Sequence, residues 1–253
     1  MKLSSILVVK NEEKHIANCL DSLSKCIDDI VVLVDSNSDD ATLDIVKGYD
    51  CVHWEVVEWM GYAETKRYAV SKTVNDWVFW IDGDEVITDG LIKELNEFKS
   101  KRPEHDVYNI ARRAYFLGKW IKHGGWYPGF VERLFNKNEC YFNQNKVHEN
   151  LEFTGSVGKL ENDLEHFTDP NIFHYYEKFN KYTTLAAEEL SERKRKARVT
   201  DILLRPLFFF IKMYIIRFGF LDGLQGLILA TFSTNYVFTK YCKLWEINNK
   251  IKK

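Results

Sequence analysis

Short apolar runs alternate with segments of helical periodicity over the first third of the chain. Three short runs, 6–9, 30–34 and 77–81, are apolar on both faces, as expected for buried strands, and 52–57 is predicted to be a further strand. Helices are predicted between them, including 62–72 and also 41–47, for which Ser38 or Asp39 is the expected N-terminal cap. Strands buried on both faces that alternate with helices predict an α/β fold, in which a Rossmann-like, mostly parallel sheet has helices on both faces.

The pattern becomes less regular in the middle of the chain. A helix is predicted near 91–98 and a strand at 107–116. The stretch 119–134 is rich in Trp, Gly and His and contains Pro128, which indicates a functional loop more than a regular element. We assign residues 1–175 to one α/β domain that carries the binding and catalytic site.

A helical C-terminal region is expected at 176–253. Residues 178–196 are predicted to form a helix that ends in a basic cluster, and 202–238 are strongly apolar. Charged side chains interrupt the apolar stretch before it reaches the ~18 to 20 residues that a membrane-spanning helix needs. An apolar surface with cations at its margin fits a peripheral position at a membrane interface. Burial against the catalytic domain and a homodimer interface are the alternatives.

Composition narrows the class of protein. The formal net charge is −2, and no zinc-knuckle or recognition-helix spacing is present, so nucleic-acid binding is not expected. The 5 cysteines form no short pairs and indicate buried thiols in a reducing compartment. The first residues lack the apolar core and cleavage site of a signal peptide. A cytoplasmic location is therefore expected.

The strand predicted at 77–81 runs straight into Asp82-Gly83-Asp84-Glu85. Two carboxylates one residue apart, beside a glycine that permits a tight turn, can present oxygen ligands to a divalent cation that also holds a diphosphate. Ligands of parallel α/β sheets bind beyond the carboxyl ends of the strands. This position favours a metal site over a turn of solvated acids.

Other polar residues follow the first two predicted strands. Lys10, Asn11 and Glu12 follow the first strand, where a cation and backbone amides could meet a phosphate, although alone they also fit a surface charge cluster. Asp35 ends the second strand and can accept hydrogen bonds from a base or ribose. The cluster 35–40 also suits the start of a helix.

Motifs spread over nearly the whole chain resemble one enzyme family. The segments 5–13, 31–42 and 77–85 resemble the first half of an inverting family-two glycosyltransferase, whose fold is the Rossmann-like GT-A type. The second half resembles the bacterial lipopolysaccharide-core heptose glucosyltransferase subgroup through segments 115–121, 123–128, 133–135, 147–149, 182–190, 219–223 and 243–246. Gly129 departs from this pattern, because many relatives have an acid after the Tyr-Pro pair.

The resemblance implies a function and a set of site residues. It implies transfer of a sugar, glucose from UDP-glucose, to a heptose of a lipid-linked inner-core saccharide at the cytoplasmic face of the membrane. The cofactor implied is Mg²⁺ or Mn²⁺, bound at Asp82 and Asp84. The residues implied at the donor are Lys10, Asn11, Glu12, Asp35, Lys66, Arg67 and Asp82.

An inverting transfer needs a carboxylate that takes the proton of the acceptor hydroxyl. Glu132, Glu139 and Glu149 lie after the acidic motif. Glu149 stands in Val147-His148-Glu149, at the place of the family's acidic catalytic motif, whereas Glu132 precedes Arg133 and can simply pair with it. We expect Glu149 to be the base.

Histidines and aromatic residues complete the candidates. His166 can be a further metal ligand or a diphosphate contact, or a hydrogen-bonded structural histidine. His123, Trp126 and Tyr127 can form an acceptor platform, because aromatic faces suit the apolar faces of sugars, or they can pack the core.

Two other functions fit the same fold. A nucleotidyltransferase would use the same sheet and paired acids, but it should have a Gly-rich, basic loop after the first strand. The acidic Asn11-Glu12-Glu13 argues against that. A non-catalytic module that binds sugars or membranes is the other alternative.

Overall fold

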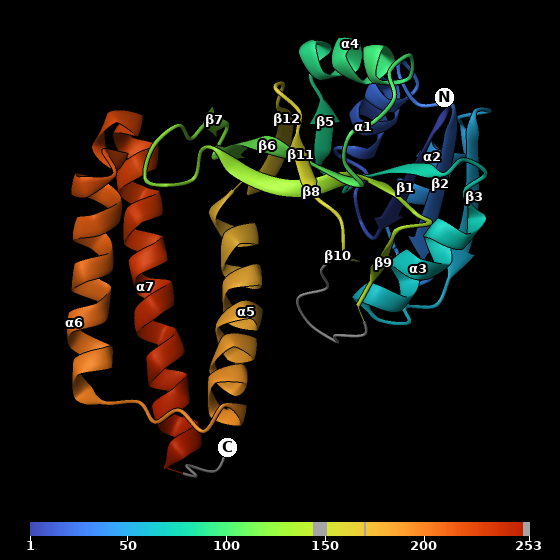
Figure 1. Cartoon of the computed structure of the whole chain (residues 1–253). Helices are drawn as coiled ribbons and strands as arrows, with labels where there is room; N and C mark the ends of the chain where they lie inside the picture. The colour runs from blue at the N-terminus through green and yellow to red at the C-terminus, as the bar shows by residue number, and fades with distance from the viewer. Residues whose placement is uncertain (144–150, 170, 250–253) are drawn as a thin grey trace. The chain divides into compact units, whose positions relative to one another are not determined.

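The computed structural model describes residues 1–143, 151–169 and 171–249 (Figure 1). The chain divides into two compact units. The α/β unit comprises Met1–Arg112 and Phe130–His166, and the helical unit comprises Arg113–Gly129 and Phe167–Lys253. Each unit is described separately below.

A parallel group of strands forms the first half of the α/β unit. It consists of β1 (Leu3–Val9), β2 (Asp29–Asp35), β3 (Val52–Val57) and β4 (Trp77–Trp80), in the spatial order β3-β2-β1-β4. Ile6 of β1 pairs with Val31 on one side and Trp80 on the other. The four predicted strands are confirmed, and the carboxyl ends of β1, β2 and β4 point to the same edge of the sheet.

Further strands extend this sheet beyond β4. The order continues with β8 (Gly129–Asn136), β6 (Val107–Phe116), β12 (Leu164–Asp169) and β5 (Glu85–Ile87). β8 runs antiparallel to β4, and β12 runs antiparallel to β5. The short strands β7 (Lys119–Trp120) and β11 (Val157–Lys159) pair with β6, while β9 (Cys140–Phe142) and β10 (Leu151–Phe153) form a separate two-stranded sheet.

The strand β8 corrects one prediction. The stretch 119–134 was expected to be a loop more than a regular element, but its second half belongs to β8. The polar residues Glu132 and Arg133 break the apolar run in the sequence. Arg133 is nevertheless buried, because carboxylates of other elements neutralise it.

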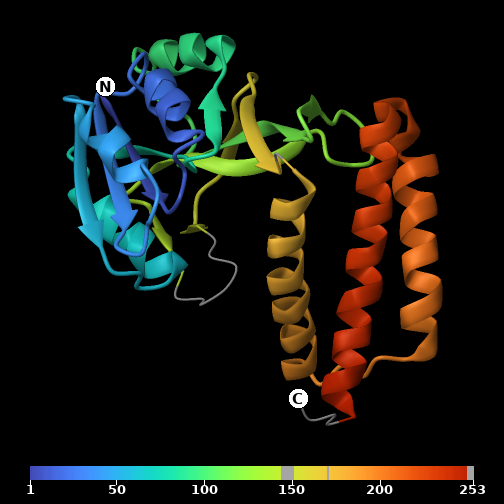
Figure 2. The same ribbon diagram turned by 180° about the vertical axis from the view of Figure 1, so that it is seen from behind.

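Helices cover both faces of the parallel strands, as predicted. Successive side chains of β1 and β2 point to opposite faces and pack into two different apolar clusters. One contains Leu7 and Val32 with residues of α1 (Ile16–Leu23) and α4 (Asp89–Phe98), and the other contains Ile6 and Val31 with residues of α3 (Tyr62–Lys72). Figures 1 and 2 show these helices on opposite sides of the strands.

The start of α2 (Thr42–Lys47) differs from the prediction. Its N-cap residue is Ala41, with no side-chain cap, so neither Ser38 nor Asp39 caps it. Both side chains instead bond to the loop after β1: the Asn11 backbone N–H donates to Ser38 Oγ at 3.4 Å, and its Nδ2 donates to Asp39 Oδ1 at 2.7 Å. The polar cluster therefore joins two strand-end loops.

Three long helices dominate the helical unit. α7 (Gly223–Asn248) packs against both α5 (Ile172–Glu192) and α6 (Val199–Phe210), and Figure 2 shows it between them. A π-helical turn, η1 (Ile211–Ile216), and a short 3₁₀ helix, η2 (Gly219–Asp222), connect α6 to α7. The helix predicted at 178–196 begins earlier and ends before the basic cluster. No helix among the described residues is long and apolar enough to cross a membrane.

Candidate functional site

A cavity of about 570 Å³ opens in the α/β unit beside the carboxyl ends of β1 and β4. Trp80 and Asp82 contribute to it from the end of β4, and Lys66 contributes from α3. Its remaining wall comes from Val8, Trp59, Asn109, Arg112, Phe130, Val131, Glu132, Arg133 and Leu151. The cavity therefore lies where a parallel α/β sheet is expected to bind its ligand.

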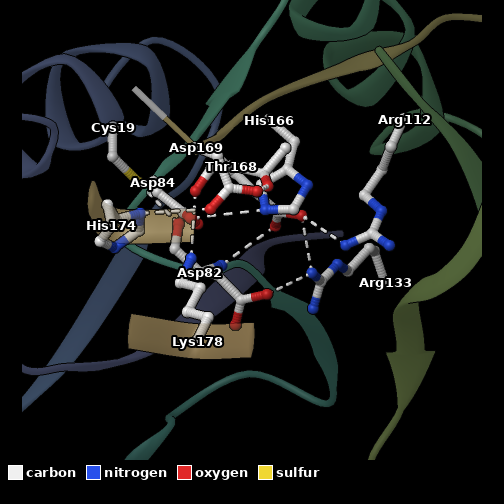
Figure 3. Close-up of polar contacts among 11 residues, drawn as sticks. Cys19, Asp82, Asp84, Arg112, Arg133, His166, Thr168, Asp169, His174 and Lys178 are labelled. Carbon is white, nitrogen blue, oxygen red and sulfur yellow. Dashed lines mark hydrogen bonds and ion pairs between the residues drawn. The ribbon is translucent and has the colours of Figure 1, made fainter. Parts of the chain in front are cut away.

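Arg133 is the charged centre of this wall (Figure 3). It is only 2% exposed, and its Nη2 donates to Asp82 Oδ2 at 2.5 Å and to Glu85 Oε1 at 2.7 Å. Burial works against the charged form of Asp82, but Arg133 and Lys66 outweigh it and hold the pKa of this carboxyl well below its ordinary value. Asp82 is therefore a permanent anion at neutral pH.

Glu85 contacts both members of this pair. Its carboxyl is fully buried, and its Oε2 accepts a hydrogen bond from the Asp82 backbone N–H at 3.1 Å. Burial raises the pKa of Glu85 above its ordinary value, although Arg133 and Arg112 act in the opposite direction. Glu85 thus fixes both the backbone of the acidic motif and the guanidinium of Arg133.

Gly83 is required by the close approach of two loops. A Cβ atom at this position would lie 2.9 Å from Val9 Cγ1 and 3.0 Å from Glu12 Cγ. Both contacts are closer than side-chain carbons tolerate without a shift. The glycine therefore lets the acidic motif lie directly against the end of β1.

Asp84 and His166 form the second part of the acidic site. His166 Nε2 lies 3.4 Å from Asp84 Oδ2, because β12 pairs with β5 and places His166 opposite Glu85. A carboxylate and an imidazole at this separation can both bind one divalent cation. Within the described ranges, no three His, Cys, Asp or Glu side chains are grouped to hold a metal ion. Asp84 and His166 therefore supply two ligands at most, and a cation bound there would need its remaining ligands from a diphosphate, water or the nearby Asp82.

Two cations lie over one aromatic ring in the cavity. Lys66 Nζ is 3.5 Å from the ring centroid of Trp80, and the Arg133 guanidinium carbon is 4.3 Å from the same centroid. Both side chains are buried. The ring face attracts these charges electrostatically and holds them at the cavity, where they can meet an anionic group.

Asp35 lies at the end of β2 with polar neighbours of its own. Asn37 donates to Asp35 Oδ1 from its backbone N–H at 2.8 Å and from Nδ2 at 3.0 Å, and Lys10 Nζ lies 3.7 Å from Oδ2. Burial opposes ionisation, but these groups outweigh it and lower the pKa of Asp35. Of the two interpretations left open for Asp35, helix capping does not apply, because α2 begins at Thr42 after Ala41.

The other predicted donor residues lie around the same edge. Asn11 adopts a left-handed conformation with φ of 54° and accepts a bond from the Asp39 backbone N–H at 3.0 Å. The Glu12 backbone N–H donates to Thr42 Oγ1 at 2.7 Å. Arg67 pairs with Glu64 one turn earlier in α3. Lys66 and Asp82 are the predicted donor residues found among the cavity walls.

The predicted acceptor residues belong to the helical unit. Asp222 is buried and accepts bonds from the Lys122 and His123 backbone N–H groups at 3.2 and 2.8 Å, and it lies 3.0 Å from His123 Nδ1. Trp126 packs partly buried against an apolar cluster that contains Met213. The Tyr127 ring meets the Trp120 ring edge-on at 5.3 Å. Asp222 therefore holds the segment that presents these residues.

The three candidate bases have different positions. Glu149 lies outside the described residues. Glu132 lines the cavity, and burial raises its pKa. Glu139 is exposed in the turn between β8 and β9.

Several cavity residues escaped the sequence analysis as site candidates. Arg112, Asn109 and Trp80 are examples. One signal was available for Arg133, because a charged residue directly before Leu134 and Phe135 of an apolar strand needs a buried partner. Its partners in the acidic motif are about 50 residues away in sequence, so pattern alone could not identify them.

Comparison with known proteins gives consistent results along the chain. The model of the family "Glycosyl transferase family 2" matches residues 4–156, more than half of the 253 residues. The lipopolysaccharide core biosynthesis glycosyltransferase LpsC of Rhizobium meliloti is 29% identical, over 97% of this chain and 93% of that protein. The uncharacterized glycosyltransferase RT0209 of Rickettsia typhi is 26% identical, over 98% and 88%.

Solved structures share the fold at low sequence identity. The mannosyltransferase PcManGT of Pyrobaculum calidifontis, solved in complex with GDP-Man and Mn²⁺, superposes with a TM-score of 0.57 and 12% identity, over 96% of this chain and 86% of that one. Residues 1–349 of TarS from S. aureus, in complex with UDP-GlcNAc, give a TM-score of 0.50 and 16% identity, over 99% and 92%. The fold is therefore that of the GT-A glycosyltransferases.

Proposed function

Since the chain belongs to glycosyl transferase family 2, we propose that it transfers glucose from UDP-glucose, with inversion, to an inner-core saccharide of lipopolysaccharide. The observation that carries this proposal is the cavity at the ends of β1 and β4, where Asp82 meets the two buried cations Lys66 and Arg133. The likeness to LpsC along nearly the whole chain supports the acceptor class.

The polar groups of the α/β unit support binding of a nucleotide diphosphate. Lys66 and Arg133 supply positive charge at Trp80 for the phosphates. Asp35 is ionised and offers an acceptor for the nucleoside, beside Lys10, Asn11 and Glu12 at the same edge of the sheet. Arg67, next to Lys66 in α3, is a further donor contact in this proposal.

We assign the metal site to Asp82, Asp84 and His166. A bound Mg²⁺ or Mn²⁺ would neutralise the charge that develops on the departing diphosphate. The hard carboxylate oxygens suit both ions. Arg133 holds Asp82 ionised and in place, so the protein supplies part of this charge stabilisation itself.

The acceptor hydroxyl needs a base, and we propose Glu149 for this role. Its support is the motif Val147-His148-Glu149. Glu132 is the second candidate, because it lines the cavity and burial raises its pKa toward the range in which a carboxylate accepts a proton efficiently. His123, Trp126 and Tyr127 are proposed to contact the acceptor sugar.

The proposal also assigns a location. Residues 1–175 carry the donor and catalytic site, and residues 176–253 form a helical region that keeps the enzyme at the cytoplasmic face of the membrane, where a lipid-linked acceptor is available. Exposed apolar residues of α6, including Leu203 and Leu207, support this peripheral position. A homodimer interface on the same region is the alternative.

A panel of nucleotide sugars tests the proposal. Thermal unfolding is followed with each nucleotide sugar, with and without Mn²⁺, and transfer to a heptose-containing acceptor is then measured for those that stabilise. We expect metal-dependent stabilisation by UDP-glucose and release of UDP. Release of pyrophosphate from a nucleoside triphosphate would indicate a nucleotidyltransferase instead, and binding without any UDP release would indicate a non-catalytic module.

A further inference from the structure

A second hollow lies in the helical unit, between α6 and α7. Its volume is about 420 Å³, and its walls share no residue with the cavity of the α/β unit. Leu204, Phe208 and Phe209 line one side. These side chains remain exposed, Phe208 by 61%, which is unusual for large apolar groups that border a groove. The groove therefore offers apolar surface to a ligand or partner.

Three cations surround the same groove: Arg205, Lys212 and Lys240. Arg205 and Lys240 lie over one ring, that of Tyr241, at 5.4 and 5.3 Å from its centroid. Burial and, after it, the neighbouring charge of Arg205 lower the pKa of Lys240, while Glu189 acts in the opposite direction. An anion in the groove would relieve this repulsion.

The acids near the groove are already engaged. Asp201 pairs with Arg205 and lies 3.6 Å from Arg195. Glu189, whose charge acts weakly on Lys240, binds Arg193 at 2.6 Å. Asp201 offsets part of the Arg205 charge, but the lining of the groove contains three cations and no acid, so its ligand should be an anion attached to an apolar body.

The apolar surface continues along the chain beyond the groove. Leu207 and Phe208 come three and four residues after Leu204 in α6, a spacing that places them on one side of the helix, and all three are exposed. Ile211, Ile215 and Phe218 are also exposed and add apolar surface in η1 and the turn after it. A segment that is too polar to span a bilayer, but has one apolar side with cations at its edge, is suited to the plane of a membrane interface.

We propose that the α6–α7 groove binds the phosphate headgroup of an anionic phospholipid, whose acyl chains lie against Leu204 and Phe208 while α6 rests in the bilayer surface. This inference rests on the peripheral membrane location that is part of the proposed function, and it names the ligand that would hold the enzyme there. It concerns lipid binding alone, so a negative result would not affect the proposed sugar transfer.

Charge favours a lipid over a second copy of the chain. In a two-fold symmetric dimer each patch meets an identical patch, so the interface would bring together two copies of the same excess of cations and add no net negative charge. An anionic bilayer supplies both the missing negative charge and the apolar phase. A soluble phosphate would supply only the charge.

Vesicle flotation tests the site in the full-length protein. Phosphatidylglycerol vesicles are compared with phosphatidylcholine vesicles, and the variant K212Q/K240Q is compared with K194Q/K196Q, which removes the same charge from the exposed basic cluster of the same unit. We expect the groove variant to partition roughly 30-fold more weakly onto anionic vesicles, and the cluster variant to lose clearly less. Equal losses in both variants would overturn a specific headgroup site.

Two further measurements address the apolar wall and the other ligands. Phe208→Ser should weaken flotation and leave the circular dichroism spectrum unchanged, since the side chain is exposed. Stabilisation by glycerol phosphate without any flotation would overturn the lipid and identify a soluble phosphate ligand. A dimer in light scattering that Phe208→Ser dissociates, together with no flotation, would identify a second copy as the partner.

Discussion

Arg133 joins the acidic motif to the sheet through two carboxylates and one aromatic ring. A guanidinium keeps its charge under all physiological conditions, so its burial is tolerated only while Asp82 and Glu85 neutralise it. The same contacts place the carboxylates. Stability and site geometry therefore depend on one side chain.

Arg133→Met should destabilise the protein by about 3 kcal/mol, because it leaves the fully buried Glu85 without its closest charged partner. Urea unfolding measures the loss. In the background Glu85→Gln the same substitution should cost less, since the amide does not need a counter-charge. An equal loss in both backgrounds would contradict the coupling between these residues.

Asp82→Asn and Asp84→Asn should each abolish transfer and metal-dependent donor binding, and both variants should still fold, although Asp82→Asn should lower the free energy of unfolding because it removes one of the two counter-charges of Arg133. Each amide removes a charged oxygen ligand from a site organised around it. The readouts are transfer rate and the Mn²⁺-dependent shift in thermal unfolding, with Asp44→Asn in exposed α2 as the matched control. Unchanged turnover in both site variants would refute the metal assignment.

Glu149→Gln should lower turnover by a factor of ~100 or more with little change in donor affinity, because the amide cannot accept the proton. Glu132→Gln is the matched comparison, since Glu132 lines the cavity. Steady-state kinetics with UDP-glucose separates the two. A large effect for Glu132→Gln and a small one for Glu149→Gln would identify Glu132 as the base.

At the scale of elements, the parallel half of the sheet could be predicted because its signal is local. β1 and β2 are apolar runs, and helices of regular period follow them. Polar residues directly after β1, β2 and β4 then indicate the ligand edge. The elements that complete the site could not be predicted in this way, because β8 and β12 pair with strands remote in sequence and include charged residues.

His166 illustrates that limit. Its neighbour Asp84 is about 80 residues earlier, and the two side chains meet only through the antiparallel pairing of β12 with β5. The connection between α6 and α7 is a second case. Its π-helical turn, its 3₁₀ turn and the left-handed Phe218 (φ of 57°) follow no simple period, so an apolar stretch was all that the sequence showed.

Within the helical unit, Asp222 of η2 holds the segment that contains the predicted acceptor residues. Asp222→Asn should loosen residues 122–124, since the buried carboxylate accepts two backbone bonds and faces His123 Nδ1. The expected loss is ~1 to 3 kcal/mol of stability. Hydrogen exchange should show faster amides at Lys122 and His123, with Asp89→Asn at the start of α4 as control. Unchanged exchange at both amides would contradict this role.

At the scale of the whole molecule, the predicted resemblance to family-two and lipopolysaccharide-core glycosyltransferases is confirmed. The family match covers residues 4–156, whereas the likeness to LpsC extends over 97% of the chain. The helical unit is therefore part of the shared protein. Its groove and the cavity of the α/β unit differ in chemistry: the first combines cations with apolar surface, and the second combines cations with paired acids.

This difference predicts that two ligands act on separate units. UDP with Mn²⁺ needs the acids and should slow hydrogen exchange around Asp82 and Arg133, but not in α6. Phosphatidylglycerol vesicles should slow exchange in α6 and leave the acidic motif unchanged, because the groove offers no carboxylate pair to a metal. Hydrogen exchange read by mass spectrometry can follow both units in one sample.

The variant Asp84→Asn should lose the effect of UDP with Mn²⁺ and keep the effect of the vesicles, while K212Q/K240Q should do the reverse. If either variant lost both effects, the two sites would not be independent, and the separation of donor binding from membrane binding would be wrong.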